Sequence, residues 1–121
     1  MILFAKILIA IIAIEHLAIL WIEMFGWETV GKKVFTSLPQ QLFAPTKMLA
    51  ANQGLYNGFL SAGLIWSLFV NNPEWQNNIA LFFLGCVVVA GIYGAITSSK
   101  KIFFIQALPA IVTFIVVLLN R

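Results

Sequence analysis

Four long apolar stretches alternate with polar stretches along this chain. They run from Ile2 to about Phe25, from about Ala50 to Val70, from Ile79 to Ile96 and from Ile102 to Leu119. A helix that spans the hydrocarbon core of a bilayer needs about 20 apolar residues, within a range of roughly 17–25. The pattern therefore predicts an all-α polytopic membrane protein: a four-transmembrane-helix bundle that forms one domain over residues 1–121.

Three polar connections separate the predicted helices. The first, from Gly26 to about Leu49, is the longest and mixes aromatic residues, prolines and lysines. Such a mixture is typical of a segment that lies at the membrane interface, where it could cap one mouth of the bundle. In the second connection Pro73 is placed to start a helix or a turn. The third, from Thr97 to Lys101, predicts a tight hairpin.

The composition supports a membrane protein. Hydrophobic residues make up 62% of the chain and charged residues 9%, and the mean hydropathy is +1.01. A soluble domain has about 25% charged residues. The net charge of +3 is small, and the basic residues lie mostly in the connections, which favours orientation in a membrane over nucleic-acid binding. The single cysteine, Cys86, allows no intrachain disulfide, so the redox compartment cannot be read.

The basic residues predict an orientation. The side that holds the two chain ends has only Lys6 and Arg121, whereas connections one and three carry five lysines. Basic residues favour the cytoplasmic side of a membrane. We therefore expect both termini to be extracytoplasmic and connections one and three to be cytoplasmic. The five lysines are Lys32, Lys33, Lys47, Lys100 and Lys101.

The adjacent residues Glu15 and His16 in the first stretch carry the strongest candidate chemistry. Ionisable residues are costly in hydrocarbon, so they usually face a bundle interior or a water-filled cavity. A carboxyl beside an imidazole can exchange protons, which makes Glu15 and His16 the predicted catalytic residues. His16 and Glu23, seven residues apart, share a helix face. The alternative is that both Glu15 and His16 serve only in packing.

A second set of polar residues opens the second predicted helix, where Gln53 and Asn57 lie on one stripe and Asn52 and Tyr56 on the next. We expect antiparallel packing to bring Glu15 or His16 within direct or one-water reach of these groups. The alternative is interhelical hydrogen bonding without a ligand. The predicted substrate-binding residues are Glu23, Asn52, Gln53, Tyr56 and Asn57.

Small residues and one proline predict features of helix packing. Gly54 and Gly58 form a GxxxG spacing, and the third stretch has further small residues at this spacing; both allow helix backbones to approach closely. Such faces could also support a homo-oligomer. In the fourth stretch Pro109 removes a backbone hydrogen bond and kinks a helix. We expect the nearby Gln106 to satisfy the freed backbone groups.

Several chemistries have no motif in the chain. It has one histidine and no Cys/His cluster, so we expect no conventional zinc site. No glycine-rich loop precedes a GK[ST] sequence, so nucleotide binding is not predicted. We expect no cofactor.

The polar motifs resemble those of domain-of-unknown-function family 1304. The resemblance rests on Glu15-His16, on Glu23-Met24-Phe25, and on the run from Asn52 to Leu60 followed by Gly63-Leu64, and it extends over essentially the whole chain. It implies a small four-helix membrane protein, most often bacterial, and hence the bacterial cytoplasmic membrane. Some members are labelled "epimerase", but nothing in this sequence supports that chemistry.

Three classes of function remain open. One is an enzyme or binding protein for a hydrophobic or lipid-like substrate, with proton transfer by Glu15 or His16. Another is a proton-coupled transporter; the small multidrug-resistance transporters share the length, the four helices and a glutamate in helix one, but not the long first connection. The third is a subunit or scaffold without chemistry. The expected partners are membrane lipid, a hydrophobic small molecule and a further copy of the chain.

Overall fold

The computed structural model describes all 121 residues and contains no strand, which confirms the all-α prediction. Each predicted apolar stretch lies almost entirely within one long helical segment. The long segments are α1 (Leu3–Phe25), α3 (Lys47–Phe69), α4 (Pro73–Thr97), and the continuous pair η2 (Phe103–Ala107) and α5 (Leu108–Leu119). Two short helices, α2 (Val30–Val34) and η1 (Gln40–Leu42), lie in the first connection.

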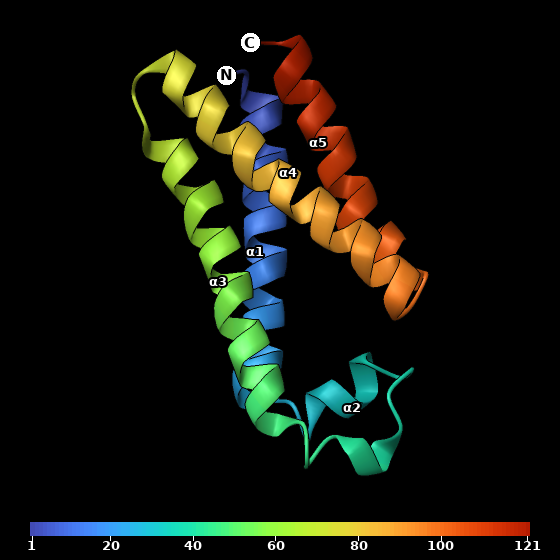
Figure 1. Ribbon diagram of the computed structural model, residues 1–121. Helices are drawn as coiled ribbons and strands as arrows, with labels where there is room; N and C mark the ends of the chain where they lie inside the picture. The colour runs from blue at the N-terminus through green and yellow to red at the C-terminus, as the bar shows by residue number, and fades with distance from the viewer.

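The most extensive helix contact in the fold is between α1 and α3. The helix α1 packs along α3 as an antiparallel neighbour, while α4 crosses the pair obliquely and α5 lies beside the first half of α1 (Figure 1). Both termini and the turn between α3 and α4 lie at one end of the molecule, and α2 lies at the other (Figure 1). The second half of α1 and the first half of α3 therefore extend beyond α5.

Two of the four predicted spans have the length and composition of a membrane-crossing helix. These are α1 and α4, with 23 and 25 residues. The 23-residue α3 is long enough, but Asn52, Gln53 and Asn57 make it less apolar. The helical stretch Phe103–Leu119 is apolar but shorter.

The apolar core occupies only the half of the bundle nearer the termini. All four long helices contribute to it, but α1 does so only through its first half. Beyond that level the buried side chains of α1 are polar: His16 is fully buried and Glu23 is 2% exposed. The change from apolar to polar burial is what marks a candidate site. The core residues are Ala5, Ile9, Ile12, Ala13, Leu64, Ala80, Leu84, Val87, Ala110 and Val117.

Two prolines shape the helices as their chemistry requires. Pro73 is the first residue of α4, and the side chain of Asn72 caps this helix by accepting a hydrogen bond of 3.1 Å from the Trp75 backbone N–H. This confirms the predicted helix start. Pro109 follows the π-helical turn η2. A wider turn accommodates a residue that lacks an N–H and whose ring clashes with the preceding turn.

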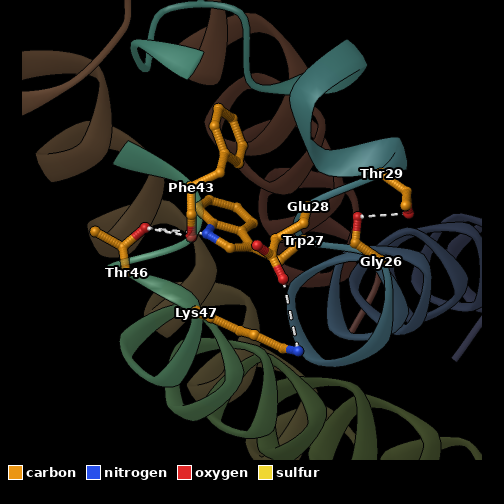
Figure 2. A network of polar contacts seen from close by, with 7 residues as sticks. All are labelled: Gly26, Trp27, Glu28, Thr29, Phe43, Thr46 and Lys47. Atoms are coloured by element: carbon orange, nitrogen blue, oxygen red, sulfur yellow. Dashed lines mark hydrogen bonds and ion pairs between the residues drawn. The ribbon is translucent and has the colours of Figure 1, made fainter. Parts of the chain in front are cut away.

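The first connection folds around Trp27. Its indole ring packs against Phe35 and Phe43, with centroid separations of 5.3 and 4.9 Å, and Phe43 is fully buried. The indole Nε1–H donates a 3.0 Å hydrogen bond to Thr46 Oγ1, as Figure 2 shows. Gly31 lies against both Trp27 and Phe43, where a side chain would be crowded. The connection is thus a small aromatic unit at one end of the bundle.

Candidate functional site

His16 lies where the apolar core ends along α1. Its Nδ1 lies 2.9 Å from the Ile12 carbonyl oxygen, and its Nε2 lies 3.2 Å from Gln106 Nε2. A carbonyl oxygen only accepts, so Nδ1 carries a proton. In a neutral ring Nε2 then accepts from the Gln106 amide, whereas a rotated amide would present its oxygen to a protonated Nε2. Gln106 can therefore match either protonation state of the imidazole.

The position of Gln106 corrects one interpretation of the sequence. We expected its amide to satisfy backbone groups freed by Pro109, but it reaches His16 instead. Gln106 lies within η2, next to Ala107, which packs closely against Gly91 of α4. Its only signal in the sequence was a lone amide in an otherwise apolar stretch.

Glu23 lies in a separate contact between α1 and α3. Asn57 Nδ2 donates a 2.6 Å hydrogen bond to its Oε1. A Cβ added to Gly54 would lie 3.0 Å from the Glu23 Cβ and 3.1 Å from the Leu20 carbonyl oxygen, so only glycine fits this approach. Farther along the same interface, Ser61 Oγ donates to the Ala13 carbonyl oxygen at 2.8 Å. The predicted glycine contact is confirmed as the α1–α3 interface.

Glu15 is the one carboxyl of α1 without a partner. It is half-buried, and its Oε1 is shielded from solvent yet has no hydrogen-bond partner. One helical residue corresponds to a rotation of about 100°. Glu15 therefore lies on the face next to that of His16 and has lost hydration at one oxygen without gaining a protein donor.

The predicted site residues do not form one hydrogen-bonded network. No direct hydrogen bond joins Glu15 or His16 to any of the four polar residues of the second stretch, and reach through one water stays a prediction. Asn52 donates to the Met48 carbonyl of its own helix, and Gln53 and Tyr56 are exposed. Only Asn57 turns toward α1. The rotation of α3 that brings its glycines against α1 carries the other three polar side chains away from that contact.

The comparisons with known proteins agree with the resemblance seen in the sequence. Residues 10–118 match the family described as "Protein of unknown function (DUF1304)". The chain belongs to this family. It is also similar to the "Uncharacterized protein YpaA" of Lactococcus lactis subsp. lactis (strain IL1403), with 31% identity over 111 residues that cover 90% of this chain and 92% of that protein. No solved structure matches.

Proposed function

We propose that the chain is a four-span membrane protein of the bacterial cytoplasmic membrane, with both termini extracytoplasmic. Large apolar side chains are exposed on all four long segments, far more than a water-soluble surface carries. The arrangement of two termini and one turn at the same end fits an even number of crossings (Figure 1). The lysine distribution supports the orientation. Examples of the exposed residues are Leu3, Ile14, Phe59, Phe69, Phe82, Val89, Ile96, Phe104 and Leu119.

Within this placement, we propose that the protein binds a hydrophobic molecule with a polar head and exchanges a proton with it through Glu15. The observation that carries the proposal is the desolvated, unpartnered Oε1 of Glu15. An unmade hydrogen bond to a desolvated acceptor is costly, and a charged group in hydrocarbon is costlier still. A ligand head that donates a hydrogen bond, such as a hydroxyl or a primary amine, would remove this cost.

His16 has a supporting role in the proposal. It is fully buried, so it does not touch a ligand that enters from lipid. It is adjacent to Glu15 in the chain, and its partner Gln106 can hydrogen-bond to either protonation state. We therefore assign Glu15 to ligand contact and His16 to a second proton site behind it.

The test uses the full-length protein in detergent. Thermal unfolding is followed with long-chain alcohols, quinols and long-chain primary amines, and with quaternary amines that have no donor. A ligand present at 100 times its Kd stabilises the folded state by about 2.7 kcal/mol. We expect stabilisation by donor heads only, with a pH dependence that Glu15→Gln abolishes and the exposed-site control Glu28→Gln retains. A folded Glu15→Gln protein with the same pH-dependent response would exclude the proton role.

A second measurement separates binding or turnover from transport. The stabilising ligand is loaded into vesicles that contain the protein, and its pH-gradient-driven movement is followed. We expect no movement beyond that of vesicles with Glu15→Gln. Glutamate-dependent flux would favour the transporter class, and the absence of any stabilising ligand would favour a scaffold.

A further inference from the structure

A polar pocket lies at the end of the bundle that holds the termini, remote from Glu15. Its volume is about 380 Å³. It forms where the first turns of α4 meet the end of the chain, close to the turn between α3 and α4 (Figure 1). Apart from a proline, every lining side chain is charged or carries an amide. The lining residues are Pro73, Glu74, Asn77, Asn78 and Arg121.

Asn77 is the feature that makes this pocket a site. The residue is 9% exposed, and its amide oxygen is shielded from solvent without a hydrogen-bond partner in the protein. Buried polar groups in folded proteins are nearly always hydrogen-bonded. No backbone N–H at the start of α4 provides this donor, since the Asn77 amide oxygen has no partner in the protein. A molecule in the pocket can supply the missing donor.

The charges around Asn77 define what that molecule carries. Glu74 lies three residues before Asn77 on α4, so both side chains lie on one face and offer acceptors. Arg121, from the other end of the chain, offers a guanidinium. A primary ammonium has three donors and no acceptor, which suits a carboxylate and an amide oxygen. A phosphate suits a guanidinium, which can bind it through two hydrogen bonds.

We infer that this pocket binds the headgroup of a phospholipid that bears a primary ammonium next to its phosphate. The ammonium contacts Glu74 and Asn77, and the phosphate contacts Arg121. The choice of a lipid rests on the membrane placement proposed above, which puts this end of the bundle at the headgroup level. The ligand of Glu15 is a different molecule at a different depth.

The experiment compares lipids that differ only in the head. The full-length protein in detergent receives phosphatidylethanolamine, phosphatidylcholine or phosphatidylglycerol with the same acyl chains, or soluble phosphoethanolamine. Choline keeps the positive charge but has no ammonium N–H to donate. At ten times its Kd, phosphatidylethanolamine should raise the Tm about 6 °C above the value in phosphatidylcholine. Glu74→Gln, Asn77→Leu and Arg121→Gln should each remove this difference.

The controls separate this inference from other outcomes. Glu74 and Arg121 are exposed, so their variants remain informative if Asn77→Leu does not fold. Glu28→Gln and Glu15→Gln should keep the preference, which makes this site testable whether or not Glu15 binds a ligand. Equal stabilisation by the three lipids, or a preference that survives Glu74→Gln and Arg121→Gln, would overturn the inference. If soluble phosphoethanolamine stabilises the protein as much as phosphatidylethanolamine does, the ligand is a soluble phosphoamine and not a lipid.

Discussion

Asn57 donates a 2.6 Å hydrogen bond to Glu23 and joins α3 to α1 at a level where the apolar core has ended. This half of the interface combines the polar pair with the packing of Met24 and Leu20 of α1 against Gly54 and Gly58 of α3. The contribution of this pair can be isolated because neither partner makes another side-chain hydrogen bond.

We expect Asn57→Leu to lower the free energy of unfolding by about 1–3 kcal/mol, since it leaves the buried carboxyl of Glu23 without its donor. Glu23→Leu should cost less than Asn57→Leu, because the remaining amide is neutral. The double variant should be more stable than the sum of the single losses predicts, with a coupling of about 1–2 kcal/mol. Unfolding of the purified protein in detergent measures all three, and strictly additive losses would show that the contact contributes nothing.

Two glycines of α4 allow a matched test of close packing. A Cβ on Gly91 would lie 2.8 Å from the backbone nitrogen of Ala107, whereas a Cβ on Gly85 would have no neighbour nearer than 4.0 Å. Alanine is the better helix former by about 1 kcal/mol. Gly85→Ala should therefore be neutral or slightly stabilising. Gly91→Ala should destabilise by about 1–3 kcal/mol because the backbone of η2 has to move; equal Tm values for the two variants would contradict this packing.

The aromatic unit in the first connection should depend on the hydrogen bond from Trp27 to Thr46. Thr46→Val keeps the shape of the side chain but removes both this acceptor and the hydroxyl that donates to the Leu42 carbonyl oxygen at 2.7 Å, so we expect a local loss of about 1–2 kcal/mol. The readout is faster proteolysis between residues 26 and 46. The control is Glu28→Gln, which breaks only the exposed 3.6 Å ion pair with Lys47 seen in Figure 2 and should change little. Equally fast cleavage of the Thr46→Val and Glu28→Gln proteins would show that this hydrogen bond does not stabilise the connection.

Labelling of introduced cysteines tests the orientation. In a Cys86→Ala background, Lys33→Cys and Lys100→Cys should be protected from a membrane-impermeant maleimide in intact cells. Asn71→Cys, in the turn between α3 and α4, should react. The expectation follows from the excess of lysines in connections one and three. If Lys33→Cys and Lys100→Cys react and Asn71→Cys is protected, the protein has the opposite orientation in the membrane.

Much of the architecture could be predicted from local information. The lengths of the apolar stretches predicted the four long helical segments, and Pro73 marked the start of α4. The spacing of Gly54 and Gly58 predicted a close helix contact. The face shared by His16 and Glu23 followed from the helical repeat, and both side chains are buried. These features depend on residues that are neighbours in the chain.

The partners of the buried polar groups could not be predicted in this way. Gln106 is 90 residues from His16, and it reaches the ring through η2 and the packing of α5 beside α1. The helical repeat placed Asn57 and Tyr56 on neighbouring stripes of α3, but it did not say which stripe would face α1. The close approach of Gly54 set that rotation, turning Asn57 inward and leaving Tyr56 exposed. Rotation about a helix axis is decided by steric fit between two surfaces, and that fit exists only once both helices are in place.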